Sequence, residues 1–454
     1  MNYLNRYIGT TVFSILAIFS GFILRFGSLP TLNDEFNLSG LAKLSVFTIA
    51  IIFSSFLTEF YTHEKNTKRE AFLNIVIWLV VSTFILSIGL YFMMPVVEFG
   101  RGWLILSIIS FGVFQFLWFI GSDALFNITG FTQRVLIIGT GKLAKQIGEV
   151  ISTTNHNNVV AGYLKCGEEF EPVSVPYQNI VGNIGSLSET IKKEKVDKIV
   201  ISLSERRGAF PMIDLLNSKM RGIEVIDAPS FYERLTGKLL IENIRPSWFI
   251  FSDGFRMTNF IRIFKRLFDL VFSFIFLISV LPVCFIIALF IKIDSSGPVF
   301  LKQVRVGEKE RNFVLYKFRT MNRDAENETG AVWTQKDDSR ATRFGRFLRK
   351  TRLDEIPQLY NIFKGDMSLI GPRPERPEFV GKLKEVVPYY SERHFVKPGL
   401  TGWAQVKYHY GSSVGDALEK LKYDLYYIKH LSFFLELHIV FETIRVVVFS
   451  RGGR

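Results

Sequence analysis

Two adjacent carboxylates, Asp354 and Glu355, are the residues of this sequence best suited to chemistry by their type and spacing. They stand just before Pro357, a residue favoured at the first position of a helix, where the helix dipole helps to keep carboxylates ionised. One such carboxylate can attack phosphorus as a nucleophile while the other helps to hold Mg²⁺ against diphosphate oxygens. An isolated Asp-Glu pair, in contrast, most often caps a helix or forms surface ion pairs.

Basic residues near this pair favour the chemical interpretation. Arg349, Lys350 and Arg352 precede the two carboxylates, and the segment Gly371–Glu375, which reads GPRPE, forms a rigid turn that carries Arg373. The guanidinium on such a turn could bind a phosphate through two parallel hydrogen bonds. We therefore predict that the two carboxylates form a catalytic pair that also binds Mg²⁺.

A further group of candidates alternates aromatic and basic residues between Gly297 and Met321 and includes Lys317 and Arg319. The alternation would suit a nucleic-acid surface, but it is more often found on a half-buried strand with a solvated basic face. Taken alone, this pattern does not establish an anion pocket.

A GxGxxA turn, with Gly139 and Gly141 as its glycines, joins a predicted strand to a predicted helix. That context suits a phosphate at a helix N-terminus. In a domain that binds a catalytic dinucleotide, the second strand also ends in an acidic residue that binds the ribose. Here the second strand, Val159–Lys165, ends in a lysine. The same part of the chain lacks the Tyr-x-x-x-Lys pair of sugar dehydratases. We therefore interpret the turn as structural or as a regulatory nucleotide site, and not as the centre of an oxidoreductase.

Four apolar stretches occupy the first part of the chain, and each approaches or exceeds the ~20 residues needed to cross a bilayer as a helix. They are Tyr7–Phe26, Leu44–Tyr61, Phe72–Met94 and Trp103–Phe126. We predict that residues 1–128 form a four-helix transmembrane bundle. The basic residues in its loops favour a position of both bundle termini on the cytoplasmic side.

Residues 129–254 alternate buried-strand and amphipathic-helix patterns, which predicts an α/β domain with a parallel, Rossmann-like sheet. A fifth apolar stretch, 267–293, follows and contains Pro282, which bends or breaks a helix. Because basic residues flank both ends of this stretch, they give no preference for a crossing. We favour a re-entrant membrane helix, and an ordinary fifth transmembrane helix with a proline kink stays an alternative.

The composition agrees with a membrane protein that acts on phosphate-rich partners. The chain has 45 Phe, a net charge of +13 and a mean hydropathy of +0.23. The positive charge fits anionic lipid or nucleotide, although the cytoplasmic loops of membrane proteins are basic in general. The two cysteines, Cys166 and Cys284, form no zinc spacing and no disulfide framework, which favours a reducing, cytosolic setting.

Residues 261–454 resemble the bacterial sugar transferases, the monotopic polyprenyl-phosphate phosphoglycosyl transferases that initiate exopolysaccharide and O-antigen synthesis. The resemblance rests on separated motifs in the order of the family: Lys265–Asp269 (KRLFD), Gly297–Phe300 (GPVF), Lys317–Met321 (KFRTM), Arg352–Leu359 (RLDEIPQL), Gly365–Glu375 (GDMSLIGPRPE), Pro398–Trp403 (PGLTGW) and Asp424–Tyr427 (DLYY). The preceding parts resemble the long form of this family. The segment Ser204–Trp248 resembles a subgroup linked to exosortase and PEP-CTERM exopolysaccharide systems.

The resemblance implies a two-step transfer of a hexose phosphate. Asp354 would attack the β-phosphorus of a UDP-sugar and release UMP, and undecaprenyl phosphate would then take the sugar phosphate from the aspartyl intermediate. Glu355 would help to bind Mg²⁺, and Asp424 would serve the second step or orient other groups. The residues expected to bind phosphate are Lys317, Arg319, Arg352 and Arg373.

The resemblance also implies a place in the bacterial inner membrane, with the soluble domains in the cytoplasm. Lys265 and Arg266 would anchor the re-entrant helix, broken at Pro282, at anionic lipid headgroups. The sequence identifies neither the sugar nor the polysaccharide pathway, and it leaves a homodimer open. Nucleic acid is not expected as a partner. A catalytically silent scaffold for polysaccharide assembly is the other alternative, and the intact Asp-Glu pair argues against it.

Overall fold

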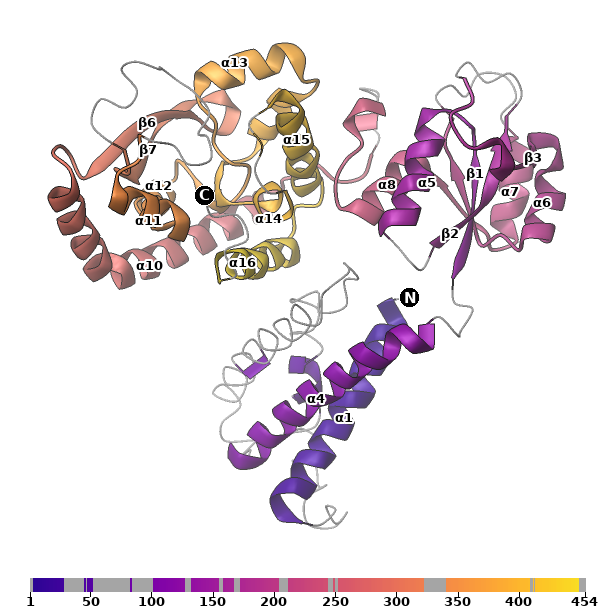
Figure 1. Cartoon of the computed structure of the whole chain (residues 1–454), viewed down its shortest axis with the longest axis horizontal. Helices are drawn as coiled ribbons and strands as arrows, with labels where there is room; N and C mark the ends of the chain where they lie inside the picture. Colours follow the sequence, from indigo (N-terminus) through magenta and orange to yellow (C-terminus); the bar gives the residue numbers. More distant parts are fainter. Residues whose placement is uncertain are drawn as a thin grey trace. The chain divides into compact units, whose positions relative to one another are not determined.

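The computed structural model of the chain forms two compact units, Met1–Ala228 and Pro229–Arg454 (Figure 1). The first unit holds two long helices and an α/β domain, and the second holds the predicted catalytic residues. The structure describes residues 3–27, 45, 47–51, 82–83, 101–126, 132–154, 158–166, 172–203, 211–243, 248–249, 252–321, 340–408, 411 and 413–448.

Helices α1 (Tyr3–Phe26) and α4 (Arg101–Phe126), the first and fourth predicted membrane segments, pack side by side. The rings of Phe22 and Trp103 meet edge to face with their centroids 5.8 Å apart. The indole Nε1 of Trp103 donates to the carbonyl of Ile18 over 3.1 Å, which ties the two helices together in a second way.

The predicted four-helix bundle is described only in part. Most of its second and third segments, Leu44–Tyr61 and Phe72–Met94, lies outside the described residues. In the short described piece of the second segment, Phe47 and Ile51 are buried in the same core as Ala17 of α1. The bundle as a whole therefore stays a prediction.

The α/β domain contains a five-stranded parallel sheet with the strand order β3-β2-β1-β4-β5. Its strands are β1 (Gln133–Ile138), β2 (Asn158–Lys165), β3 (Ile180–Asn183), β4 (Lys198–Ile201) and β5 (Glu224–Asp227), and its helices include α5 (Lys142–Thr154), α6 (Leu187–Glu194) and α7 (Met212–Met220). The strand order reverses beside β1, as in doubly wound folds. The predicted parallel, Rossmann-like sheet is confirmed.

The C-terminal unit packs short strands and helices around one long helix. Its elements are α8 (Ala228–Thr236), α10 (Asn259–Asp294), β6 (Phe300–Val306), β7 (Asn312–Phe318), α11 (Arg343–Thr351), α12 (Gln358–Lys364), β8 (Ser368–Ile370), α13 (Pro377–Val386), β9 (Gly399–Thr401), α14 (Trp403–Lys407), α15 (Val414–Lys429) and α16 (Phe433–Val448). Strands β6 and β7 form an antiparallel hairpin, and β8 and β9 form a parallel pair. The main core gathers apolar residues of α13, α14, α15 and α16.

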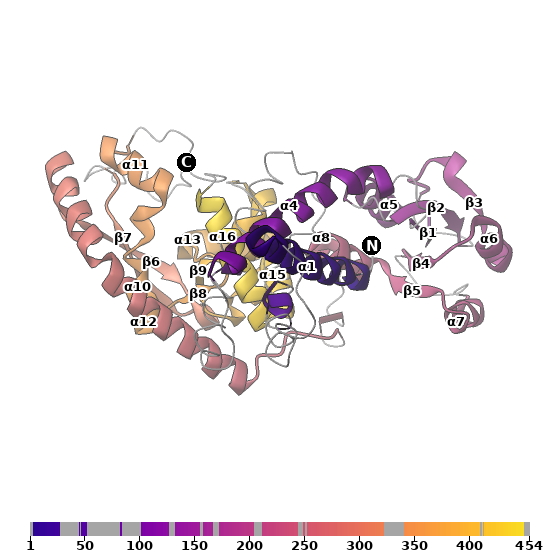
Figure 2. The same ribbon diagram turned by 90° about the horizontal axis from the view of Figure 1, so that it is seen from below.

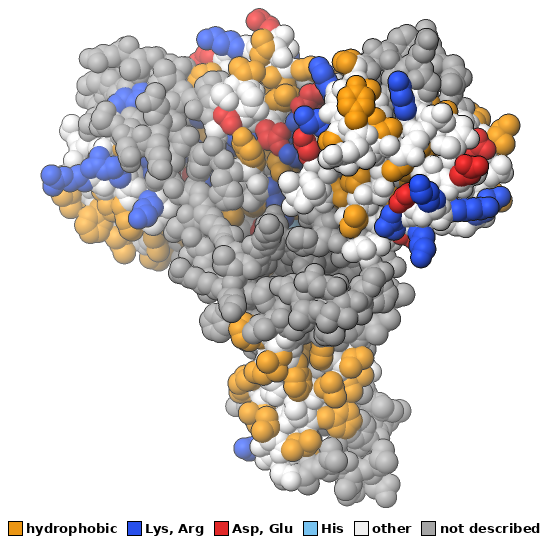
Figure 3. Space-filling model, turned by 45° about the vertical axis from the view of Figure 1, so that its right-hand side comes forward, with side chains coloured by type: hydrophobic (Ala, Val, Ile, Leu, Met, Phe, Trp, Pro, Cys, Tyr) orange, Lys and Arg blue, Asp and Glu red, His pale blue; other side chains and the backbone are white. Residues whose placement is uncertain are grey.

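Within the described residues, α10 is the one helix long and apolar enough to cross a membrane by its length and composition. Figure 3 shows hydrophobic side chains gathered at the left of the C-terminal unit, where α10 lies in Figure 1. Pro282 lies inside the helix, and the ribbon changes direction along its course (Figure 1). A bend is expected there because proline removes a backbone hydrogen bond and clashes with the preceding turn.

Both halves of α10 contact the rest of the C-terminal unit. In two views, α11, α12 and the β6-β7 hairpin lie on one side of the helix (Figures 1 and 2). Near its start, Asp269 Oδ1 accepts from the backbone N–H of Leu369 over 2.9 Å. Near its end, Ile287 and Ile291 are buried in a cluster with Phe318.

Lys265 and Arg266 bind protein groups at the start of α10. Lys265 is only 8% exposed; its Nζ donates to the Ile370 carbonyl over 3.0 Å and pairs with Glu436 of α16. Arg266 donates over 2.7 Å to each of two carbonyls at the end of α12. The Lys265 ammonium is thus enclosed and paired within the protein, and anchoring of the helix at lipid headgroups by Lys265 and Arg266 stays a prediction.

Several described residues of the linking segment 229–257, between β5 and α10, pack into the core of the C-terminal unit. Leu239 and Ile241 are each 1% exposed and belong to the core that also holds α15. The Nε1 of Trp403 donates to the carbonyl of Gly237 over 2.7 Å. From the sequence, this segment is assigned to the middle domain, which is predicted to end at residue 254. An apolar pattern shows that a segment is buried, but it does not show which of two cores the segment joins.

We expect the linking segment to stabilise the C-terminal unit measurably. Ile241→Ala should lower its free energy of unfolding by about 2–5 kcal/mol, the usual cost of truncating a buried isoleucine. The measurement is the temperature at which this unit of the detergent-solubilised chain loses its resistance to trypsin. Ile213→Ala on α7, where the side chain is 76% exposed, is the matched control and should leave that temperature unchanged. Equal temperatures for Ile241→Ala and wild type would contradict this packing.

Candidate active site

The predicted catalytic pair lies at a sharp junction between α11 and α12. Helix α11 ends at Thr351, and the next residue, Arg352, has a left-handed backbone with a φ of 59°. The short 3₁₀ helix η5 (Leu353–Glu355) follows and carries both carboxylates, and Pro357 then caps α12. The predicted helix after the pair is confirmed, and both acidic side chains are buried.

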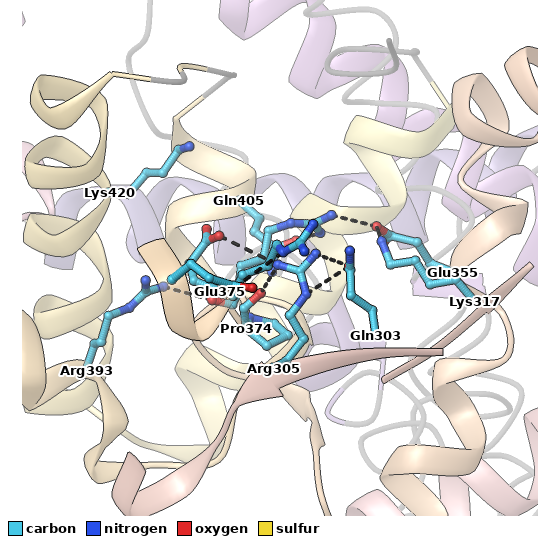
Figure 4. A network of polar contacts seen from close by, with 12 residues as sticks. Gln303, Arg305, Lys317, Glu355, Pro374, Glu375, Arg393, Gln405 and Lys420 are labelled. Atoms are coloured by element: carbon cyan, nitrogen blue, oxygen red, sulfur yellow. Dashed lines mark hydrogen bonds and ion pairs between the residues drawn. The ribbon is translucent and has the colours of Figure 1, made fainter. Parts of the chain in front are cut away.

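Three basic residues from three different elements surround Glu355. Its Oε1 accepts from Arg373 Nη2 over 2.8 Å and from Lys317 Nζ over 3.2 Å, and Arg352 Nη1 lies 3.7 Å away. Lys317 comes from β7, and Arg373 comes from the turn after β8. Figure 4 shows Lys317 and Glu355 side by side at one end of a larger polar network.

The charges in this cluster determine the ionisation of Glu355. Burial alone would raise the pKa of Glu355, but Arg373, Lys317 and Arg352 outweigh that effect and hold the pKa well below its ordinary value. Burial lowers the pKa of Lys317, and the charge of Glu355 offsets part of this effect. If a substitution removes one partner of such a buried pair, the charge of the remaining partner is no longer compensated.

Asp354 differs from its neighbour because its carboxylate makes no hydrogen bond or ion pair with any described residue. Burial and the negative charge of Glu355 raise the pKa of Asp354, and Lys317, Arg373 and Arg349 offset part of the increase. The two adjacent carboxylates therefore have different properties. Protein groups neutralise Glu355, whereas Asp354 has no such partner among the described residues.

A second basic group beside the pair was not assigned a role from the sequence. Arg305 of β6 donates from Nε to Gln303 Oε1 over 3.2 Å and from Nη1 to the Pro374 carbonyl over 3.1 Å (Figure 4). Burial lowers the pKa of Arg305 to about 10; Glu375 opposes this effect, and Arg373 adds to it. Gln303 and Arg305 are two residues apart on a strand, and this spacing in the sequence indicates that their side chains point to the same face of the strand.

Basic side chains outnumber carboxylates among the described residues of this site. The basic residues are Arg305, Lys317, Arg352, Arg373, Arg376 and Lys420, and the acidic residues are Asp354, Glu355 and Glu375. Buried charges of one sign are costly unless a counter-charge compensates them. The site is therefore suited to an anion that carries more than one negative charge.

The turn that presents Arg373 is fixed by its backbone. The N–H of Gly371 donates to the Thr401 carbonyl over 2.9 Å, which extends the pairing of β8 with β9. A side chain at Gly371 would lie 2.3 Å from the carbonyl of Lys397, so only glycine permits this approach. Arg373 Nη1 also donates to Gln405 Oε1 over 3.3 Å, which helps to orient the guanidinium.

Arg319, which is predicted to bind phosphate, contacts the turn after α10. Its Nη2 donates to the carbonyl of Ser295 over 2.7 Å and to the hydroxyl of the same residue over 2.9 Å. A side chain at Gly297 would collide with its Nη1. The guanidinium is buried, and its charge is not among the main ones that act on the carboxylate pair. Phosphate binding by Arg319 stays a prediction.

Gly139, in the predicted nucleotide turn after β1, has a φ of 116°. A side chain there would lie 2.5 Å from the carbonyl of Ser202, just after β4. The packing of two neighbouring strands therefore requires this glycine, which agrees with the structural interpretation of the turn. Nucleotide binding by Gly139 and Gly141 stays a prediction.

The carboxylate pair fits Mg²⁺ only together with a phosphate ligand. Within the described residues, no group of three or more His, Cys, Asp or Glu side chains could hold a metal ion. Mg²⁺ usually binds through one or two carboxylates and completes its octahedron with water and substrate phosphates. Asp354 offers such a carboxylate, and Arg373 and Lys317 both contact Oε1 of the Glu355 carboxylate, its second candidate ligand.

Residues 260–450, which contain the carboxylate pair, the Arg373 turn and nearly all of α10, match the family described as "Bacterial sugar transferase". The "Uncharacterized sugar transferase EpsL" of Bacillus subtilis (strain 168) is 40% identical over 195 residues, which are 42% of this chain and 90% of the relative. The chain belongs to the bacterial sugar transferase family. The resemblance inferred from the motifs is confirmed.

Longer relatives carry more specific names. The "UDP-glucose:undecaprenyl-phosphate glucose-1-phosphate transferase" of Escherichia coli (strain K12) is 29% identical over 408 residues, 88% of this chain and 80% of the relative. The "UDP-N-acetylgalactosamine-undecaprenyl-phosphate N-acetylgalactosaminephosphotransferase" of Aeromonas hydrophila is 40% identical over 233 residues, 51% of this chain and 54% of the relative. Matches to relatives from Komagataeibacter xylinus and Xanthomonas campestris pv. campestris cover 60% and 66% of their lengths. The chain thus spans about half to two thirds of the last three relatives.

We expect this basic site to bind inorganic pyrophosphate in the detergent-solubilised chain. Arg373→Gln should weaken the affinity about 10- to 100-fold, because a hydrogen bond to a charged group contributes about 1.5–3 kcal/mol. Isothermal titration calorimetry is the measurement. Lys364→Gln, which removes an exposed lysine paired with Asp366, is the matched control and should leave the affinity unchanged. Equal affinities for Arg373→Gln and wild type would place the anion elsewhere.

Proposed function

We propose that this protein is an undecaprenyl-phosphate sugar-1-phosphate transferase that moves a hexose-1-phosphate from a UDP-sugar to undecaprenyl phosphate and releases UMP. The observation that carries this proposal is the Asp354 carboxylate, which has no partner among the described residues and lies beside a cluster of basic side chains. A carboxylate next to an anion site is suited to attack on phosphorus. The names of the relatives support both substrates.

In the first step, Asp354 attacks the β-phosphorus of the UDP-sugar. A bond forms between a carboxylate oxygen and that phosphorus, the bond from the phosphorus to the bridging oxygen breaks, and UMP leaves with the electron pair. Arg373 and Lys317 reduce the negative charge on the phosphate oxygens. Glu355 keeps these two basic side chains in place through its ion pairs.

In the second step, an oxygen of undecaprenyl phosphate attacks the same phosphorus. The bond between phosphorus and Asp354 breaks, which restores the carboxylate and releases the lipid-linked sugar diphosphate. This product would initiate the synthesis of exopolysaccharide, O-antigen or capsule.

Mg²⁺ is the cofactor that we propose for this reaction. Asp354 and Glu355 would hold it beside the diphosphate, in agreement with the preference of this ion for carboxylate and phosphate oxygens. When bound, it would supply positive charge that polarises the phosphoryl oxygens.

We also propose that α10 enters the cytoplasmic leaflet of the bacterial inner membrane as a re-entrant helix. Lys265 near its start and Ile291 near its end contact the same C-terminal unit. A spanning helix would instead hold its ends on opposite sides of a ~30 Å hydrocarbon layer. Large exposed apolar side chains follow the helix from Phe260 to Ile293, which suits contact with lipid. The N-terminal helices would add membrane crossings, with both soluble domains in the cytoplasm.

Release of UMP tests the proposed reaction. Membranes that contain the wild-type chain should release UMP when they receive undecaprenyl phosphate, Mg²⁺ and the correct donor, and EDTA should stop the release. The donors include UDP-glucose and UDP-N-acetylgalactosamine, the sugars in the names of the relatives. Asp354→Asn should reduce the rate by more than about 10³-fold, because the amide is a poor nucleophile.

Glu385→Gln, which changes an exposed side chain on α13, is the matched control for this assay and should keep the wild-type rate. Full activity of Asp354→Asn would exclude the aspartyl intermediate. The absence of UMP with every donor would contradict the proposed donor class.

The acidic limb of the pH profile of kcat/KM should report the ionisation of Asp354. The carboxylate must be ionised to attack, so activity falls as the pH drops through its pKa. Lys317→Met removes a positive charge that lowers the pKa of Asp354. The acidic limb of the pH profile of this variant should therefore move to higher pH. Glu355→Gln removes a negative charge that raises this pKa, so the limb should move to lower pH. Shifts in the same direction would contradict this assignment.

A further inference from the structure

Asp424 of α15 forms a buried ion pair that the mechanism above does not use. Its carboxylate is 2% exposed, and Oδ2 lies 2.8 Å from Arg393 Nη2. Arg393, which is 6% exposed, comes from the 3₁₀ helix η6 (Tyr390–Phe395). Figure 4 shows Arg393 at the opposite end of the polar network from Glu355. The enclosed Asp424 carboxylate therefore has no surface with which to touch a substrate.

Arg393 is connected to the active site through one backbone carbonyl. Its Nη1 donates to the hydroxyl of Tyr390 over 2.6 Å, and its Nη2 donates to the carbonyl of Arg373 over 3.0 Å. Arg373 in turn donates from its own Nη2 to Glu355 Oε1 over 2.8 Å. The guanidinium of Arg393 thus holds the peptide that carries the guanidinium bound to Glu355.

We propose that Asp424 and Arg393 are positioning residues for the transfer reaction. Asp424 fixes the guanidinium of Arg393, Arg393 holds the Arg373 carbonyl, and this arrangement directs Arg373 toward Glu355 and the substrate phosphate. The inference rests on the proposed function for its kinetic consequence. It also decides between the two roles open to Asp424, because it assigns the residue to orientation and not to the second chemical step.

The ionisation of Asp424 agrees with this role. Burial raises its pKa to about 6, and the charge of Arg393 offsets part of the effect of burial. The ion pair with Arg393 favours the ionised form of this carboxylate. Since its carboxylate faces Arg393 in the interior, it is held by the protein and is not exposed to the lipid substrate.

A double-mutant cycle between Asp424 and Arg373 tests the proposal. Residues that act through one another give losses that do not multiply, whereas independent residues give losses that do. We expect Asp424→Asn to lower kcat/KM about tenfold or more in the wild-type background, and less than about threefold in the Arg373→Lys background. Arg393→Lys, which keeps the charge, should retain more activity than Arg393→Met.

Glu233→Gln on α8 is the matched control, because it also removes a buried charge that is paired with a basic residue. Glu233 is buried and pairs with Lys429, the last residue of α15, over 2.7 Å, and neither residue contacts the Arg373 turn in the described contacts. This variant should leave kcat/KM unchanged. If Asp424→Asn does not fold, as judged by its melting temperature, the cycle is measured with Arg393→Lys in its place.

Losses that multiply in the two backgrounds would overturn the proposal, because Asp424 would then act independently of Arg373. If the wild-type chain releases UMP from no donor, the proposed function fails, and the same cycle is measured on the affinity for pyrophosphate. Losses of affinity that do not multiply would then support the positioning role, and losses that multiply, or no loss in Asp424→Asn, would overturn it.

Discussion

The buried carboxylate of Glu355 and its basic partners constrain the whole active site. Removing a carboxylate from water costs several kcal/mol unless opposite charges and hydrogen bonds compensate. Lys317 on β7, Arg352 at the end of α11 and Arg373 on the turn after β8 provide this compensation. The three elements must therefore hold fixed positions around one oxygen. The same arrangement leaves Asp354, the neighbouring carboxylate, without a partner among the described residues, and the two adjacent acids therefore differ in their surroundings.

Charged groups also determine how the apolar helix α10 is attached. Lys265 and Asp269 turn inward, where they bind Glu436 and the backbone of β8, while large apolar side chains cover the outward face. A helix held this way belongs to the folded unit and not to a separate membrane anchor. Since β8 continues into the Arg373 turn, the contacts that dock α10 lie a few residues from the contacts that orient the active-site guanidinium.

The residues shared with the family do not make up the whole C-terminal unit. The family match covers 260–450, yet the linking segment 229–257 places Leu239 and Ile241 in the same core as α15. Trp403, which begins α14, binds the carbonyl of Gly237 in this segment. The catalytic domain of this chain is therefore completed by residues that precede the family match, and the apolar area buried by them contributes to its stability.

The sequence by itself determined the elements and the family, because these depend on residues that are close together in the chain. Alternating patterns predicted the parallel sheet, the apolar run predicted α10, and Pro357 marked the helix after the catalytic pair. Only the tertiary structure decided which groups each basic residue contacts. Lys265 pairs with a residue 171 positions away, and Arg319 binds Ser295. Burial and charge compensation arise from contacts between distant segments, and a local motif does not contain them.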